Sequence, residues 1–275
     1  MKILCIYHAN CADGMAAATI VRMHYGSGLV EFYQGSYGSP PPDVTGRQVL
    51  MVDFSYKREV LVQMAAKAQN ILILDHHKTV QENLTNLPEN VVVNFNMDKS
   101  GCGITWETFF GWEKPPMMVR MIEDRDLWRF NLRGSRELHA FLSSQPYRFD
   151  DWQSIMEDDC INEMERMIQM GGAILDAMMT NINELIRIGE HEVVINEVKV
   201  PALNCPPMWF SEAGAILSKG SPFAALYFED GETRKWGLRS NAEGLDVGKI
   251  AESHGGGGHR HAAGFIEPRL SGVGQ

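Results

Sequence analysis

The chain has 275 residues, of which 44% are hydrophobic and 22% are charged, and its formal net charge is −10. This length and composition predict one large or two modest globular domains with a sizeable core. The acidic balance, with no basic stripe, argues against a protein that tracks long DNA or RNA and favours a small anionic substrate. No run approaches 18 apolar residues, so no membrane span is expected.

Five cysteines without a CxxC pair predict reduced thiols rather than a disulfide framework. The N-terminus enters a predicted strand by residue 3, without a charged leader or a small-residue cleavage site. The cytoplasm is therefore the expected location.

Residues 1–130 alternate strand-like and helix-like segments. Short apolar, β-branched runs predict strands at 3–7, 31–33, 49–52, 70–74 and 91–95. Helices are predicted at 14–24, 57–68, 101–110 and 116–123. This alternation predicts an α/β fold, in which a parallel sheet is covered by helices on both faces. The predicted N-terminal domain covers residues 1–150.

The next segment, residues 151–190, predicts a long connecting helix. Its apolar residues recur at spacings of three, four and seven from Ile161 to Leu185, as on an amphipathic helix. From residue 191 the pattern changes to short strands at 191–200, 224–228, 235–239 and 263–266, with helices at 210–219 and 246–253. Residues 191–275 are therefore predicted to form a second, smaller α/β domain.

Three of the predicted strands open into side chains that can bind metal ions. Strand 70–74 continues into Asp75-His76-His77, strand 49–52 into Asp53, and strand 3–7 into His8, Asn10, Cys11 and Asp13. Ligands of an open α/β sheet bind outside the carboxyl ends of its strands. We therefore expect these side chains to converge at one crevice, where carboxylates and imidazoles would ligate divalent ions.

Taken singly, these acids have structural alternatives. Asp13 and Asp75 could each cap the helix that follows it, whereas Asp53 is well placed to bridge two ions. Asp124 ends a predicted helix, where the helix dipole disfavours a negative charge, so a metal ion is a candidate partner. Asp126 is the competing candidate for that role.

A glycine-rich segment near the C-terminus carries a second signal. Residues 255–258 are four consecutive glycines, followed by His259. Glycine backbones can cradle an anion with their N–H groups. A flexible linker is the alternative, but the immediate return to the apolar run 262–266 argues against it. Arg239, next to Ser240 at a predicted strand end, could make a bidentate phosphate contact.

Together, these residues resemble the DHH phosphoesterase superfamily. Asp75-His76-His77 matches its signature triplet, and the glycine-histidine stretch 255–259 with residues 262–265 resembles the motif of its C-terminal DHH-associated domain. The resemblance implies a two-manganese hydrolase with a DHH domain (1–150), a connecting helix (151–190) and a DHH-associated substrate-binding domain (191–275). It assigns metal-centre roles to His8, Asp13, Asp53, Asp75, His76 and Asp124. Catalytic roles fall to Asp13, Asp75 and His77, with His77 near the scissile phosphate, and substrate binding to Arg239, Ser240, Gly257, Gly258 and His259.

One residue departs from the family pattern. The first motif commonly has two aspartates separated by one residue, and here that pair is Cys11-Ala12-Asp13. Either Cys11 ligates a metal ion as a thiolate, or one metal position has fewer ligands. A thiolate would shift the preference towards zinc or iron. Two divalent ions are expected, and manganese is inferred from the family, with Mg²⁺, Zn²⁺ and Fe²⁺ left open.

The predicted function is a metal-dependent phosphodiesterase, similar to exonucleases and nano-RNases, that hydrolyses short oligonucleotides to nucleoside monophosphates. A pyrophosphatase or exopolyphosphatase is the first alternative, disfavoured by the few Lys and Arg residues after residue 190. A non-catalytic nucleotide-binding module with a degenerate metal site is the second, and only Cys11 favours it. The expected partner is a short oligonucleotide or a nucleotide-like phosphate, with no membrane partner. A homodimer is among the oligomeric states left open.

Overall fold

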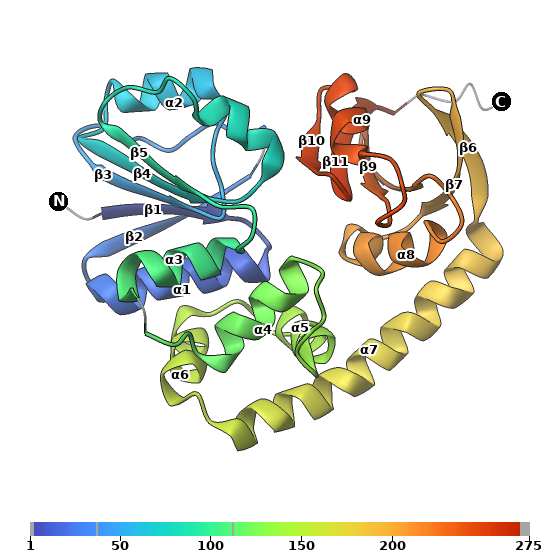
Figure 1. Ribbon diagram of the computed structural model, residues 1–275, viewed down its shortest axis with the longest axis horizontal. Helices are drawn as coiled ribbons and strands as arrows, with labels where there is room; N and C mark the ends of the chain where they lie inside the picture. Colours follow the sequence, from blue (N-terminus) through green and yellow to red (C-terminus); the bar gives the residue numbers. More distant parts are fainter. Residues whose placement is uncertain (1–2, 37, 112, 270–275) are drawn as a thin grey trace. The chain divides into compact units, whose positions relative to one another are not determined.

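The computed structural model describes residues 3–36, 38–111 and 113–269, and it divides into two compact units, Met1–Leu175 and Asp176–Gln275 (Figure 1). The division falls within the long helix α7 (Ile161–Gly189), so each unit contains part of that helix. In the described ranges, no helix combines the length and the apolar character needed to cross a membrane.

The first unit is built on a five-stranded parallel sheet. Its strands are β1 (Ile3–His8), β2 (Val30–Gly35), β3 (Gln48–Val52), β4 (Asn70–Asp75) and β5 (Val91–Phe95), in the order β2-β1-β3-β4-β5. The predicted parallel α/β sheet is confirmed. The strand order reverses at β1, so the carboxyl ends of β1 and β3 flank the switch point where such sheets bind ligands.

Helices cover both faces of this sheet (Figure 1). Successive side chains of a strand point to opposite faces, and β1 shows the alternation. Cys5 and Tyr7 pack in the core under α1 (Ala12–Tyr25) and α3 (Gly101–Phe110), whereas Leu4 and Ile6 pack in the core under α2 (Arg58–Ala65). The two-sided core explains why the strands are continuous apolar runs in the sequence.

Further helices extend the α1–α3 side of the first unit. They are α4 (Met117–Asp126), α5 (Ser135–Ser144), α6 (Phe149–Asp158) and the first part of α7, and a 3₁₀ helix, η1 (Lys78–Leu84), follows β4. The single helix expected over 151–190 is two helices in the structure. Asp159, with a φ of 39°, caps the end of α6 before α7 begins. Helix α5 was not predicted.

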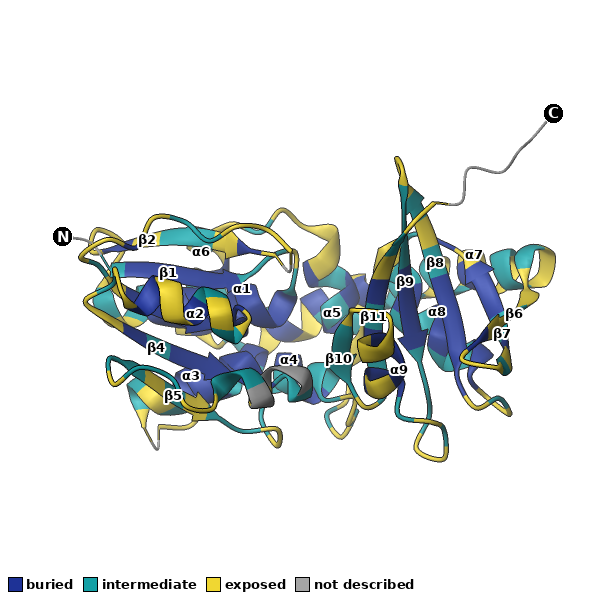
Figure 2. Ribbon diagram, turned by 90° about the horizontal axis from the view of Figure 1, so that it is seen from above, coloured by how far each residue is buried: buried dark blue, intermediate teal, exposed yellow. Residues whose placement is uncertain are grey.

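The second unit has a six-stranded mixed sheet. Its elements are β6 (His191–Ile195), β7 (Val198–Asn204), η2 (Pro207–Trp209), α8 (Phe210–Leu217), β8 (Ala224–Asp230), β9 (Thr233–Arg239), α9 (Val247–Ser253), β10 (Gly257–His259) and β11 (Ala262–Pro268). The strand order is β10-β11-β9-β8-β7-β6. Helices α8 and α9 pack in separate cores, and Figure 2 shows buried residues concentrated in the central strands.

The strand predicted over 191–200 is a hairpin in the structure. Asn196 and Glu197 link β6 to β7, with φ values of 48° and 65°. Two consecutive positive φ values characterise the tight type I′ turn of two-residue hairpins.

Candidate metal centre

Side chains that follow β1, β3 and β4, together with one from the end of α4, form three groups of atoms in the described part of the first unit that could bind a metal ion. The first group is His8, Cys11 and Asp53, and the second is Asp13, His76 and Asp126. The third, Asp53, Asp75 and His77, shares Asp53 with the first. Within each group, one ligand atom per residue lies within 4.8 Å of the others. The strand ends therefore deliver their ligands to one place, as expected for this type of sheet.

Asp53 lies between the first and second groups. Its Oδ1 is 3.2 Å from Nε2 of His76, and its Oδ2 is 3.6 Å from Nδ1 of His8. The residue has a φ of 55°, and its backbone N–H donates to the carbonyl of Leu74, 2.9 Å away, next to the end of β4. A Cβ at Gly101 would lie 2.4 Å from the Cβ of Asp53, so only glycine fits there. One carboxylate thus faces both donor groups.

The imidazole of His76 is surrounded by carboxylates. Besides Asp53, the Oδ2 atoms of Asp13 and Asp126 lie 3.8 and 3.6 Å from its Nε2. Burial acts to lower the pKa of His76, but these carboxylates outweigh it and raise the pKa to about 10. Burial and the neighbouring Asp53 and Asp126 also raise the pKa of Asp13 well above its usual value. Excess negative charge of this kind is what a bound divalent cation neutralises.

Asp13 is fixed by the start of another helix. Its Oδ2 accepts the N–H of Gly101 at 2.6 Å, and its Oδ1 accepts the N–H of Cys102 at 3.0 Å and the hydroxyl of Ser100 at 2.8 Å. The N-cap position of α1 belongs to Cys11, which makes no side-chain cap. Asp13 therefore satisfies the N-terminal N–H groups of α3 instead of capping its own helix.

Asp75 holds the two histidines of the triplet in place. Its Oδ1 accepts the backbone N–H of His76 at 2.7 Å and of His77 at 3.2 Å, and it lies 2.7 Å from Nδ1 of His77. Burial acts to raise the pKa of Asp75, but the His77 imidazole outweighs it and the pKa is lowered. A carboxylate that orients a histidine in this way is common behind metal sites.

Two carboxylate oxygens of this cluster suit a cation. Within residues 3–36, 38–111 and 113–269, neither Oδ2 of Asp53 nor Oδ2 of Asp75 has a hydrogen-bond partner, although the side chains are 1% and 0% exposed. Buried polar atoms without partners are rare and costly. Oxygen, nitrogen and sulfur donors in this combination match divalent transition-metal ions. The residues present therefore fit the metal centre that the sequence predicts.

The structure distinguishes between Asp124 and Asp126. Oδ1 of Asp124 accepts the N–H of Asn131 at 2.8 Å, and its Oδ2 accepts the N–H of Leu132 at 3.1 Å and the hydroxyl of Ser135 at 2.5 Å. The Asp124 carboxylate therefore closes the turn that leads into α5 and lies outside both donor groups. Asp126, the competing candidate from the sequence, lies in the second group.

The predicted substrate-binding residues belong to the second unit. Arg239 ends β9 opposite Ala262 of β11, and Ala262 pairs with His259 of β10, so Arg239 and His259 lie in one row of the sheet. Nη2 of Arg239 donates to the hydroxyl of Ser211, 3.3 Å away. The hydroxyl of Ser240 is 3.0 Å from Nδ1 of His261.

The last two of the four glycines form part of a hairpin, and the first two lie in the short segment between α9 and this hairpin. Gly257 and Gly258 belong to β10 and pair with Gly264 and Ala263 of β11. Gly258 has a φ of 143°, and a Cβ on it would lie 2.5 Å from the carbonyl oxygen of Ala262. Close backbone approach and an unusual φ both require glycine at this position.

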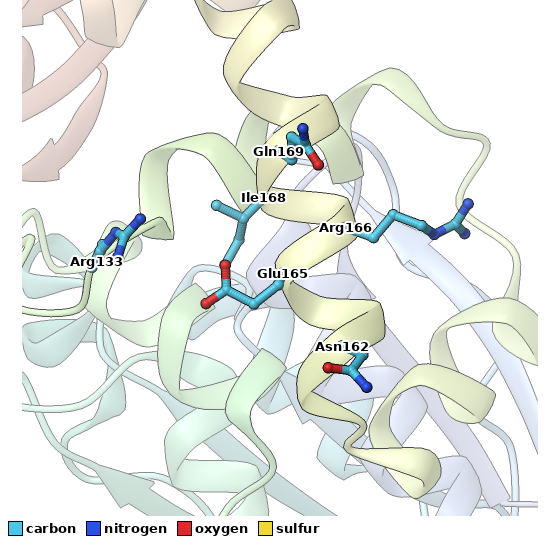
Figure 3. Close-up of a pocket in the computed structure, with 6 residues that line it drawn as sticks. All are labelled: Arg133, Asn162, Glu165, Arg166, Ile168 and Gln169. Carbon is cyan, nitrogen blue, oxygen red and sulfur yellow. The ribbon is translucent and has the colours of Figure 1, made fainter.

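A hollow of about 490 Å³ lies beside α7 in the first unit (Figure 3). Its lining residues are Arg133, Asn162, Glu165, Arg166, Ile168 and Gln169. None of them belongs to the donor groups, and Arg166 is paired with Glu163 at 2.6 Å. The residues of this unit that could bind a metal ion therefore lie at the strand ends and not in this hollow.

Comparison with solved structures shows which known proteins share this fold. PggH, a pGpG-specific phosphodiesterase from Vibrio cholerae, aligns over 98% of this chain and 94% of its own, with a TM-score of 0.54 and 14% identity. RecJ from Thermus thermophilus in complex with Mn²⁺ aligns over 96% of this chain and 49% of its own, with a TM-score of 0.56 and 14% identity. The chain shares the fold of these two solved structures.

Sequence comparison adds one relative. The uncharacterized protein R106 of Acanthamoeba polyphaga mimivirus is 27% identical over 292 residues, covering 97% of this chain and 68% of R106. No family model matches the chain. The resemblance seen in the triplet and the glycine motif agrees with the fold shared with PggH and RecJ.

Proposed function

We propose that this protein is a metal-dependent phosphodiesterase that hydrolyses short oligonucleotides to nucleoside monophosphates. The observation that carries the proposal is the position of Asp53, whose two carboxylate oxygens face two separate groups of donor atoms. A shared carboxylate between two donor groups is the arrangement that two-metal phosphoesterases need.

Each donor group has a defined role in this proposal. His8, Cys11 and Asp53 would hold one divalent ion, and Asp13, His76 and Asp126 would hold the other. Bound ions would stabilise the charge that develops on a phosphate ester during hydrolysis. Asp75 fixes the ring of His77, whose side chain is 13% exposed, so that His77 can donate a hydrogen bond to a phosphate oxygen.

The second unit would bind the substrate. Arg239, Ser240, Gly257, Gly258 and His259 would contact its terminal phosphate or nucleotide, with the arginine making a charge-assisted contact. Two comparisons support a nucleotide substrate: PggH is named for pGpG, and a second solved RecJ, bound to manganese, is named an exonuclease. The net charge of −10 favours short substrates over long polymers.

The test is a substrate panel with purified full-length protein. Di- to pentanucleotides, a cyclic dinucleotide, pyrophosphate and polyphosphate are incubated with Mn²⁺, and the products are separated by chromatography. We expect nucleoside monophosphates from the short linear substrates and their loss in Asp126→Asn. Release of inorganic phosphate from pyrophosphate or polyphosphate alone would overturn the oligonucleotide proposal, and no hydrolysis of any substrate would overturn the enzyme assignment.

A further inference from the structure

The two donor groups that meet at Asp53 differ in chemical type. The first offers an imidazole nitrogen, a carboxylate oxygen and the sulfur of Cys11, whereas the second offers an imidazole nitrogen and carboxylate oxygens only. Thiolate ligands select thiophilic ions such as Zn²⁺ and Fe²⁺, and carboxylate-rich sites suit Mn²⁺ or Mg²⁺. The difference therefore concerns which ion each position would hold.

The position of Cys11 separates it from the other thiols. Cys5, Cys102 and Cys205 are buried in hydrophobic cores, where a thiol acts as a small apolar group. Cys11 is only partly buried, at the N-cap of α1, and follows Asn10, which has a φ of 54°. A left-handed residue just after β1 thus places the cysteine at the end of the sheet.

An independent observation indicates a ligand in the first group. Oδ2 of Asp53 is buried, has no hydrogen-bond partner in the part of the chain that the structure describes, and lies on the side of His8. Oδ1 of the same carboxylate faces His76. An unsatisfied buried carboxylate oxygen next to a thiol and an imidazole is what a cation-binding position requires.

We propose that the two positions bind different ions. The position formed by His8, Cys11 and Asp53 takes a thiophilic divalent ion of the Zn²⁺ type, with the Cys11 thiolate as a ligand. The position formed by Asp13, His76 and Asp126 takes a harder ion of the Mn²⁺ type. The catalytic meaning of this mixed centre rests on the proposed function, but its metal preference does not.

Cobalt titration followed by absorbance tests the proposal without an activity assay. Chelated, dialysed full-length protein receives Co²⁺, which gives a thiolate-to-metal charge-transfer band in the near ultraviolet only when sulfur is a ligand. Cys11→Ser and Cys11→Asp are the test variants. Cys160→Ser is the matched control, since Cys160 is also partly buried but belongs to neither donor group.

We expect the band to saturate at about one Co²⁺ per chain in the parent and in Cys160→Ser, and to be absent in both Cys11 variants. Zn²⁺ affinity, measured by competition with a chelating dye, should fall about 100-fold or more in Cys11→Ser. Cys11→Asp should instead lower the preference of this position for Zn²⁺ over Mn²⁺ relative to the parent.

Three results would overturn the proposal. If the parent binds Co²⁺ without the band, Cys11 is not a ligand. The hydrolase proposal is then unaffected, because the donor group of Asp13, His76 and Asp126 can still hold a metal ion. If the band persists in Cys11→Ser, the sulfur comes from another cysteine. Failure to bind any Co²⁺ would overturn both the mixed centre and the metal-dependent function.

Discussion

Two acids at the end of α4 allow a paired test of the metal centre. Asp124→Asn and Asp126→Asn make the same near-isosteric change two residues apart. Asp126 belongs to a donor group, whereas Asp124 closes the turn into α5. We therefore expect Asp126→Asn to reduce metal binding and Asp124→Asn to reduce stability.

The magnitude for Asp124→Asn follows from its three hydrogen bonds. Donors from Asn131 reach one carboxylate oxygen, and donors from Leu132 and Ser135 reach the other. An asparagine amide has one acceptor oxygen, so at least one donor must face an NH₂ group. Losing one charge-assisted bond at this buried position costs about 1.5–3 kcal/mol. The free energy of unfolding should fall by that amount, and Mn²⁺ affinity should stay within about twofold of the parent.

Asp126→Asn should give the reverse pattern. Its side chain is 28% exposed and contributes to the negative charge around His76. Removing the charge should weaken Mn²⁺ binding by about 10–100-fold or more, with little loss of metal-free stability. Urea unfolding in a chelator gives the stabilities, and calorimetry gives the affinities. If Asp124→Asn lost Mn²⁺ binding at unchanged stability, or Asp126→Asn kept the parent affinity, the assignment of these acids would be wrong.

Three further predictions concern the same unit. In Gly101→Ala the new Cβ would lie 2.4 Å from the Cβ of Asp53, so the affinity for Mn²⁺ should fall about tenfold or more. Gly28→Ala is the control, because a Cβ there meets nothing within 4 Å and the variant should bind Mn²⁺ as the parent does. Equal affinities in the two variants would contradict this prediction. Mn²⁺ at about 100 times its Kd should raise the free energy of unfolding of the parent by about 2.7 kcal/mol, measured by thermal unfolding, and should raise that of Asp53→Asn far less. The same gain in stability in both proteins would argue against a shared carboxylate. Burial lowers the pKa of His139 to about 3 from 6.5, so the folded chain keeps this imidazole neutral while the unfolded chain takes up a proton below pH 6.5. Stability should therefore fall by about 2 kcal/mol between pH 8 and pH 5 on account of this residue, and unfolding in a chelator should show a shallower fall in His139→Gln; identical slopes would refute the burial argument.

The sheet and most of the candidate ligands at its edge could be predicted from the sequence because they follow from local patterns. A strand buried on both faces is a continuous apolar run, and parallel strands all end at one edge. That logic locates His8, Asp53 and Asp75 at one edge without knowledge of the rest of the fold. The same logic predicts each ligand type, because the strand-end residues are read directly from the sequence.

Other features depend on contacts that the sequence does not show. Residues two apart on a helix point in directions about 200° apart, so spacing alone cannot tell which of Asp124 and Asp126 faces the strand ends. The role of Asp13 depends on the N-terminus of α3, whose Gly101 lies 88 residues away. Helix α5 is only 10 residues long and begins after Gly134, which is in a left-handed conformation and makes no side-chain cap, so no capping residue marks its start in the sequence.

The backbone of Asp53 has a consequence for how this chain could evolve. Its left-handed conformation costs a non-glycine residue about 1–2 kcal/mol. Burial acts to raise the pKa of Asp53, but His76 and His8 outweigh it and lower the pKa well below its usual value, so its negative charge is stabilised where it lies. Asp53→Gly would relieve the backbone cost, but it would also remove the carboxylate that lies 3.2 Å from Nε2 of the buried His76. A substitution that relaxes this backbone position therefore removes the residue that faces both donor groups, so the chain can keep the metal centre only by keeping a strained conformation at Asp53.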